Sequence, residues 1–157
     1  MRRRSTSRRP KVLVDTSFLL PALGIEVEKE AMDAIKLFRK LDVHYLEVGF
    51  LEAMWKVLKT VPEEHLDVVA LGLDAIRSTY TRLDIPSEAY VEAYRIYRRG
   101  HRDFIDALYY STASIQKIPL LTIDVSFVEF LEKHEYRVEG VVYTPENLED
   151  LIRSVPR

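Results

Sequence analysis

Apolar and polar residues follow one another along the chain in a way that predicts strands and helices in turn. Short apolar runs rich in Val, Leu and Ile are typical of buried strands, whereas apolar residues that recur every three or four positions are typical of amphipathic helices. The predicted strands span residues 11–15, 43–46, 81–86, 119–124 and 141–143. The predicted helices span residues 28–40, 50–59, 63–79, 87–99, 101–117, 125–135 and 145–154.

Strands that alternate with helices at this spacing are typical of βαβ units. We therefore expect an α/β fold with three layers, α/β/α, around a central, mostly parallel sheet of four or five strands. Residues 11–157 are predicted to form a single domain, because no repeat, low-complexity segment or linker interrupts them. Residues 1–10 carry five arginines and are predicted to be a disordered basic tail, with an arm that contacts RNA phosphates as the alternative interpretation.

Two of the predicted helices carry more detailed signals. The apolar residues of helix 50–59 fall on one side, which is its predicted apolar face: Leu51, Met54, Trp55 and Leu58. Ser87 is expected to cap the helix that runs to about Arg99, and Gly100 is a suitable residue just past its C-terminus.

Composition narrows the chemistry that the chain can support. It has no cysteines and its four histidines are scattered, so neither a thiolate site nor a histidine-built zinc site is expected. The net charge is -2, so contact with nucleic acid would need local basic patches or a bound metal. No apolar run is long enough to span a membrane, and we expect a cytoplasmic protein without membrane contact. One Asn and one Gln beside 31% charged residues are typical of a hyperthermophile.

Two aspartates stand directly at the ends of predicted strands. Asp15 closes the strand 11–15, and Asp124 closes the strand 119–124. Ligands of open α/β sheets bind outside the carboxyl ends of the strands, so the two carboxylates are expected to share one edge. Each aspartate could instead cap the helix that follows it, and the sequence leaves both interpretations open.

A third aspartate, Asp106, lies among apolar residues in the helix 101–117. A carboxylate there is costly to desolvate unless something compensates its charge. Asp103, three residues earlier, is predicted to share nearly the same helix face. A divalent cation would relieve the repulsion among these acids, and hard oxygen ligands suit Mg²⁺ or Mn²⁺.

Four short segments in this order resemble the PIN domain family, especially the archaeal ribonuclease toxins called VapC. The segments are Asp15-Thr16-Ser17, Glu52, Asp106-Ala107-Leu108 with Thr112-Ala113, and Leu120-Leu121-Thr122-Ile123-Asp124. The resemblance runs from about Lys11 to Phe130. It implies a catalytic metal site, which holds Mg²⁺ or Mn²⁺ and consists of Asp15, Glu52, Asp106 and Asp124, with Asp103 as an accessory acid.

The glutamate of this site has two candidates. Glu52 is preferred to Glu47, because Glu52 begins the amphipathic helix and is followed by apolar residues that would fix its direction. The resemblance also implies that Ser17 and Thr122 supply hydroxyls that orient carboxylates or waters. Ser126 stands where the family often has another acid, which leaves a second metal position open.

The resemblance implies a metal-dependent endoribonuclease that hydrolyses RNA phosphodiesters with metal-bound water. Family members tend to be homodimers and VapC toxins are neutralised by a small antitoxin, so RNA, an antitoxin and a second copy are the expected partners. Two alternatives stay open. One is an RNA-processing or ribosome-maturation nuclease with no antitoxin, and the other is a catalytically idle module that binds RNA or protein.

Residues 89–102 interleave tyrosines with arginines just before Asp103. Three arginines are expected at the surface as RNA contacts: Arg98, Arg99 and Arg102. Three tyrosines are predicted to form the buried stripe of the helix, with stacking on RNA bases as the alternative interpretation: Tyr90, Tyr94 and Tyr97.

Overall fold

The computed structural model describes residues 8–155, and its centre is a five-stranded parallel sheet with the order β3-β2-β1-β4-β5. The strands are β1 (Lys11–Val14), β2 (Asp42–Tyr45), β3 (Thr81–Arg82), β4 (Leu120–Leu121) and β5 (Val142–Tyr143). The predicted α/β fold with a parallel sheet is confirmed. β4 is shorter than expected, because Pro119 has no N–H to donate and the chain turns after Leu121 toward the next helix.

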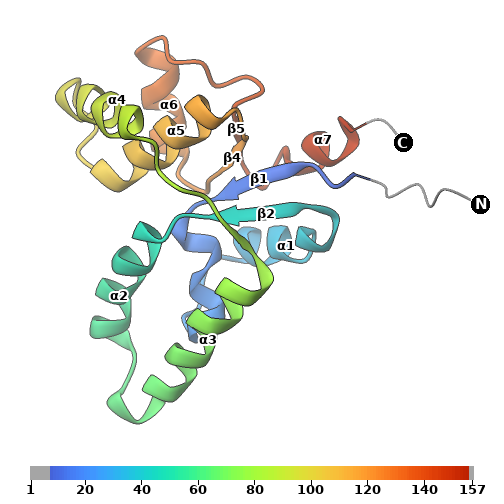
Figure 1. Cartoon of the computed structure of the whole chain (residues 1–157), viewed down its shortest axis with the longest axis vertical. Coiled ribbons are helices and arrows are strands. Elements are labelled where there is room, and N and C mark those ends of the chain that lie inside the picture. The colour runs from blue at the N-terminus through green and yellow to red at the C-terminus, as the bar shows by residue number, and fades with distance from the viewer. Residues whose placement is uncertain (1–7, 156–157) are drawn as a thin grey trace, which may run out of the picture.

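Helices cover both faces of the sheet, and in Figure 1 α4, α5 and α6 lie above it while α1, α2 and α3 lie below. The α-helices are α1 (Lys29–Ile35), α2 (Val48–Thr60), α3 (Leu66–Thr79), α4 (Ser87–Arg98), α5 (Phe104–Gln116), α6 (Val125–Lys133) and α7 (Leu148–Arg153). Short 3-10 helices are η1 (Thr16–Phe18), η2 (Leu20–Leu23), η3 (Phe38–Lys40) and η4 (Glu63–His65). Within residues 8–155, no helix has the length and apolar character that crossing a membrane requires.

The central strand β1 joins two hydrophobic cores. Val12 and Val14 pack with residues of α1, α2, α3 and α7, whereas Leu13 packs with residues of α4, α5 and α6. All three side chains are fully buried. Alternate side chains of a strand point to opposite faces, so a strand covered on both sides is apolar throughout, as the sequence shows here.

Several helix ends differ from the prediction. The expected helix 28–40 is broken into α1 and η3, and the first turn of the expected helix 63–79 is the 3-10 helix η4. Ser87 is the first residue of α4 rather than its cap, because the extended Pro86 occupies the cap position and no side chain bonds there. Gly100 follows α4 with φ of 123°, a backbone conformation that favours glycine.

The expected helix 101–117 begins three residues late, at Phe104. Asp103 ends the preceding loop, and its Oδ1 accepts hydrogen bonds from the backbone N–H groups of Ile105 and Asp106 at 3.0 and 3.1 Å. The prediction that Asp103 and Asp106 share a helix face is therefore wrong, because Asp103 is the N-cap residue of α5.

Of the four residues on the predicted apolar face of α2, only Met54 packs against the core, and it is half-buried. Leu51, Trp55 and Leu58 are 61%, 61% and 71% exposed. The buried residues are Gly49, Phe50, Ala53 and Val57. Small residues at positions 49 and 53 let α2 approach the core closely, so this side is buried although its side chains are smaller than those of the outer side.

The prediction of a buried tyrosine stripe on α4 is also wrong. Tyr90 and Tyr94 are 48% and 60% exposed, and Tyr97 is half-buried. Ala89, Ala93 and Ile96 are buried instead, on the side where α4 packs against α5. The two alanines give α5 room to approach, which leaves the bulky rings on the outside.

Candidate metal-binding and catalytic site

The two strand-end aspartates lie at the same edge of the sheet, as neighbouring parallel strands require. Val14 pairs with Leu121, and the N–H of Asp15 donates to the carbonyl of Leu121 at 3.1 Å. Thr122 connects both acids: its hydroxyl bonds to the Asp15 carboxylate and accepts the backbone N–H of Asp124 at 3.1 Å. One threonine thus holds the two carboxylate-bearing segments together.

Each of these aspartates is also a helix cap. Oδ1 of Asp15 accepts the N–H of Ser17 at 2.9 Å, and Oδ1 of Asp124 accepts the N–H of Phe127 at 3.0 Å. The two interpretations left open by the sequence are therefore compatible. The caps fix both carboxylates at the carboxyl edge, where the start of each following helix presents N–H groups to them.

Asp15 is almost fully buried beneath this edge. Burial raises its pKa to about 6, although hydrogen bonds from Thr122 and from the backbone and hydroxyl of Ser17 act in the opposite direction. Ser17 and Thr122 thus contact the carboxylate that they were predicted to orient. Their hydrogen bonds favour the charged form of a group that burial disfavours.

Asp106 lies in the first turn of α5 and faces the other acids. Burial raises its pKa to about 8, and the negative charges of its neighbours raise it further. In decreasing order of effect these neighbours are Asp103, Asp124, Asp15 and Glu52. The four other acids of the predicted site are therefore close enough to Asp106 to disfavour its charge.

Glu52 reaches this cluster from α2. Its pKa is raised to about 7, first by burial and then by the charges of Asp103 and Asp15, while Lys56 and the Thr16 hydroxyl lower it. Its Oε2 is buried without a hydrogen-bond partner among the residues that the structure describes. Glu47, by contrast, forms an ion pair with Arg77 at the half-exposed start of α2. The structure thus places Glu52 rather than Glu47 beside the aspartates.

Whether these residues fit a metal ion is a question of both chemistry and geometry. Within residues 8–155 no three His, Cys, Asp or Glu side chains come close enough together to hold a metal as they stand. The chemistry nevertheless fits: the donors are carboxylate oxygens, the Glu52 Oε2 has no other partner, and burial opposes the charge of Asp15 and Asp106. Carboxylates of this kind are typical ligands of a hard divalent cation.

Sequence analysis missed His101, whose Nε2 lies 3.2 Å from Oδ2 of Asp106. The imidazole stacks on Phe127 with ring centroids 4.3 Å apart, and a second ring, Phe130, lies 5.2 Å away. Burial lowers the pKa of His101, which favours the neutral ring. His101 lies five residues before Asp106 and outside α5, and this spacing gives no sequence signal for the contact.

Tyr109 is the second residue that sequence analysis did not single out. It is fully buried, and its hydroxyl lies 2.9 Å from Oγ1 of Thr16. The same Thr16 hydroxyl interacts with Glu52, and burial together with the nearby acids raises the pKa of Tyr109. Tyr109 therefore contacts the site through Thr16, whose hydroxyl lies between Tyr109 and the carboxylate of Glu52. The spacing of one helical turn between Asp106 and Tyr109 is the only signal that could have pointed to it.

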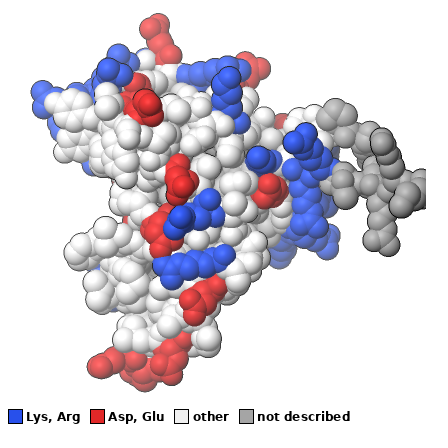
Figure 2. All heavy atoms as spheres, viewed as in Figure 1, with Lys and Arg blue, Asp and Glu red and all other residues white. Residues whose placement is uncertain are grey.

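The three arginines predicted to contact RNA come just before the acids of α5 along the chain. Arg98 ends α4, Arg99 is its C-cap residue, and Arg102 directly precedes the N-cap Asp103. All three are exposed. Figure 2 shows Lys and Arg side chains at the upper left of the molecule, over α4.

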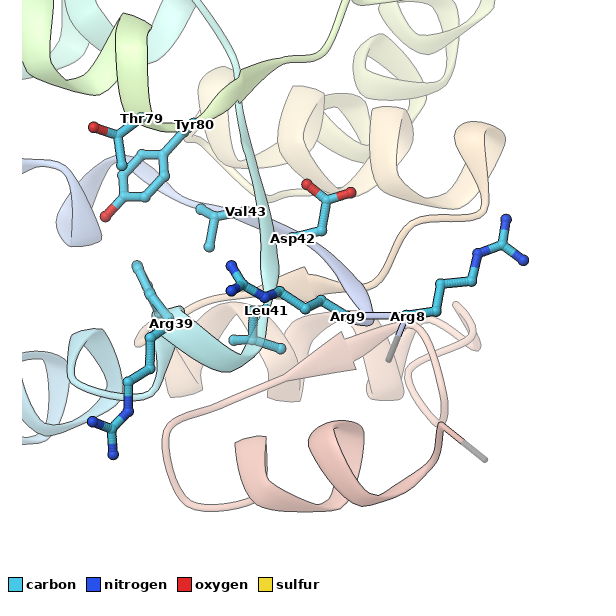
Figure 3. Close-up of a pocket in the computed structure, with 9 residues that line it drawn as sticks. Arg8, Arg9, Arg39, Leu41, Asp42, Val43, Thr79 and Tyr80 are labelled. Carbon is cyan, nitrogen blue, oxygen red and sulfur yellow. The ribbon is translucent and has the colours of Figure 1, made fainter. Parts of the chain in front are cut away.

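A separate cavity of about 550 Å³ lies at the opposite, amino edge of the sheet. Its lining includes Arg8, Arg9 and Arg39 around the apolar residues Leu41 and Val43. In Figure 3 the three arginine side chains point in different directions rather than toward one point in the cavity. The remaining predicted arm residues, 1–7, lie outside the described residues.

Comparisons with known proteins agree with this architecture. A VapC toxin of Mycobacterium tuberculosis that cleaves the sarcin-ricin loop is 20% identical, with a TM-score of 0.57 and coverage of 75% of this chain and 93% of that one. A protein of Pyrobaculum aerophilum is 23% identical, with a TM-score of 0.59 and coverage of 94% and 96%. A toxin–antitoxin complex from Klebsiella pneumoniae contributes a chain that is 19% identical, with a TM-score of 0.55 and coverage of 85% and 97%.

At these sequence identities the likeness to the three solved structures shows the fold alone. Among curated proteins no sequence matches this chain. The sequence pattern of the PIN domain family, however, matches residues 12–132. This match includes all five acids of the site. The chain therefore belongs to the PIN domain family.

Proposed function

We propose that this chain is a metal-dependent endoribonuclease of the VapC toxin type. Asp15, Glu52, Asp106 and Asp124 would hold Mg²⁺ or Mn²⁺, with Asp103 as an accessory acid. The observation that carries the proposal is the environment of Asp106. A partly buried carboxylate whose pKa is raised to about 8 among four other acids is poorly stabilised without a cation.

When bound, the cation would supply an activated water and positive charge at the scissile phosphate. The protein's own residues keep the acids in place for this task. Thr122 and Ser17 hold Asp15, and the ring of His101 holds Asp106. Glu52 Oε2 is the atom that we assign to accept a proton, because it has no hydrogen-bond partner among the described residues.

An antitoxin is the partner that we propose for this toxin. One of the structural relatives is part of a toxin–antitoxin complex. The exposed side chains of Leu51, Trp55 and Leu58 give α2 an apolar outer face beside Glu52, which suits an apolar protein segment. A basic side chain on that segment could pair with the carboxylates in place of the cation. Homodimer formation stays a prediction that sedimentation of the purified chain would test.

Cleavage of an end-labelled RNA by the purified chain tests the proposed activity. We expect internal cleavage with Mg²⁺ or Mn²⁺, none in EDTA, and none for Asp106→Asn with either ion. A folded protein that binds Mn²⁺ but cuts no RNA would favour the catalytically idle module. Cleavage without growth arrest on expression in a bacterial host would favour an RNA-processing nuclease over a toxin.

A further inference from the structure

The outer face of α4 exposes two aromatic rings one helical turn apart. Tyr90 and Tyr94 are 48% and 60% exposed, and Val91 beside them is 52% exposed. Tyrosines have apolar rings that usually find cover, and the neighbouring Ala89 and Ala93 show that the helix buries its other side. Adjacent exposed rings of this kind are typical of a surface that binds a ligand.

Positive charge gathers at the C-terminal end of the same face. Arg98 lies four residues beyond Tyr94, and Arg102 lies over the ring of Tyr97 at 5.2 Å. Within residues 8–155 neither Arg98 nor Arg102 has a carboxylate within salt-bridge distance, whereas Arg95 pairs with Glu92. The blue region over α4 in Figure 2 agrees with this charge. Two arginines are thus available to an anionic ligand.

This end of α4 leads directly into the acidic site. After Arg98 the chain passes through His101, which contacts Asp106, to Asp103 at the start of α5. Clustered carboxylates repel a polyanion, and the chain as a whole has a net charge of -2. A nucleic-acid strand therefore needs local cations near these acids, and Arg98 and Arg102 come just before the acids Asp103 and Asp106 along the chain.

We propose that the α4 face formed by Tyr90, Tyr94, Arg98 and Arg102 binds single-stranded RNA and leads it into the acidic site. Bases stack on the two tyrosines, and phosphates contact the two arginines. Unpaired bases are required, because paired bases do not expose their rings for stacking on tyrosine. The unpaired arginines favour RNA over a protein as the occupant. The inference rests on the proposed nuclease function and names the form of its substrate.

Fluorescence anisotropy of a labelled 12-nucleotide RNA tests the proposal. The parent for these measurements is the full chain with Asp106→Asn in EDTA, so that binding is measured without cleavage or metal. We expect Tyr90→Ala/Tyr94→Ala to raise the Kd about 10-fold or more, because stacking on one ring contributes about 1–3 kcal/mol. Tyr90→Phe/Tyr94→Phe should bind like the parent, since stacking needs the ring and not the hydroxyl.

The contribution of Arg98 and Arg102 is measured by the salt dependence of RNA binding. Arg98→Ala/Arg102→Ala should reduce the slope of log Kd against log salt concentration by about 1.4, since each phosphate contact on a single strand contributes about 0.7. Arg39→Ala, which removes one positive charge at the opposite edge of the sheet, should leave both the Kd and the salt dependence unchanged. Leu71→Ala, which removes an exposed apolar side chain of α3, is the matching control for the tyrosines.

Two results would overturn the proposal while leaving the nuclease function intact. In one, the tyrosine-to-alanine variant binds and, with Asp106 restored, cleaves single-stranded RNA like the unmutated chain. In the other, a duplex of the same sequence binds as tightly as the single strand.

If the tyrosine change turns a dimer into a monomer without altering the Kd for RNA, the face is an interface between copies. If the parent binds no RNA and the unmutated chain cleaves none, the proposed function itself fails.

Discussion

Gly49, at the start of α2, lies directly against the hydroxyl group of Tyr109 in α5. A Cβ atom at position 49 would overlap Tyr109 Oη and lie 3.0 Å from Thr16 Oγ1. The two oxygens form a buried hydrogen bond with each other and cannot both move away without breaking it. The helix that carries Glu52 therefore reaches Thr16 and Tyr109 only because residue 49 has no side chain.

Gly49→Ala should destabilise the protein by about 1–3 kcal/mol, which is the usual cost of overpacking a core. Tyr109→Phe alone should cost about 1 kcal/mol through loss of the hydrogen bond to Thr16. In the double variant the nearest ring atom, Cζ, would lie 3.6 Å from the new methyl group, so the losses should be smaller than their sum. Urea denaturation of the three variants tests this coupling, and additive losses would contradict it.

The fold and the edge that carries the acids could be predicted because both follow from local patterns. Apolar runs ending on Asp15 and Asp124 mark neighbouring strands of a parallel sheet, and the carboxyl ends of such strands meet at one edge. Asp106 was identifiable because a carboxylate among apolar residues needs an explanation. The resemblance to the PIN family then implied a glutamate, and the start of the amphipathic helix favoured Glu52 over Glu47 for it.

What the sequence left undetermined is which apolar residues pack. In α2 and α4 the larger apolar side chains form one periodic stripe and smaller residues such as Ala53 and Ala93 form another. Periodicity gives preference to the larger stripe, but the closely packed core accepts the smaller one. The contact between His101 and Asp106 was equally hidden, because it forms across the loop that precedes α5.

The structure also separates the two glutamates that compete for the site. Glu52→Gln should weaken Mn²⁺ binding and lower RNA cleavage by about 10-fold or more. Glu47→Gln should change neither, because that carboxylate pairs with Arg77 instead of facing the acids. Calorimetric titration of each purified variant with Mn²⁺ measures the difference. A larger loss for Glu47→Gln would place the metal at the start of α2.

The ring of His101 offers a test of how Asp106 is positioned. His101→Phe keeps a ring to stack on Phe127 and removes the nitrogen that contacts Oδ2 of Asp106. We expect a nearly unchanged melting temperature and a Kd for Mn²⁺ about 10-fold higher, as for other residues that orient a metal ligand.

His134→Phe is the matched control for this change. Its ring stacks on Phe130 with centroids 4.1 Å apart, and its Nδ1 bonds to a backbone carbonyl instead of a carboxylate. This variant should bind Mn²⁺ like the unmutated chain. Equal Mn²⁺ affinity for both histidine variants and the parent would show that His101 only packs.

The raised pKa of Asp106 predicts how the stability of the metal-free protein changes with pH. The carboxyl has an ordinary pKa of 3.8 and a folded-state value of about 8. Between these values the folded state holds a proton that the unfolded state has released. Stability therefore falls as pH rises across this window, by up to about 1.4 kcal/mol per pH unit for one group. Above about pH 8 the group is charged in both states and the loss is complete.

Asp106→Asn removes this titration and keeps the shape of the side chain. Without metal at pH 8 the variant should be more stable than the unmutated chain by several kcal/mol, up to about 6 for the full window of about 4 pH units, and the difference should shrink toward pH 4. RNA cleavage should be lost at every pH. Urea denaturation in EDTA across this range measures the effect, with Asp84→Asn on the surface as the control. A variant less stable than its parent at pH 8 would mean that the carboxylate supports the fold, and Asp106 would then lose its assignment as a metal ligand.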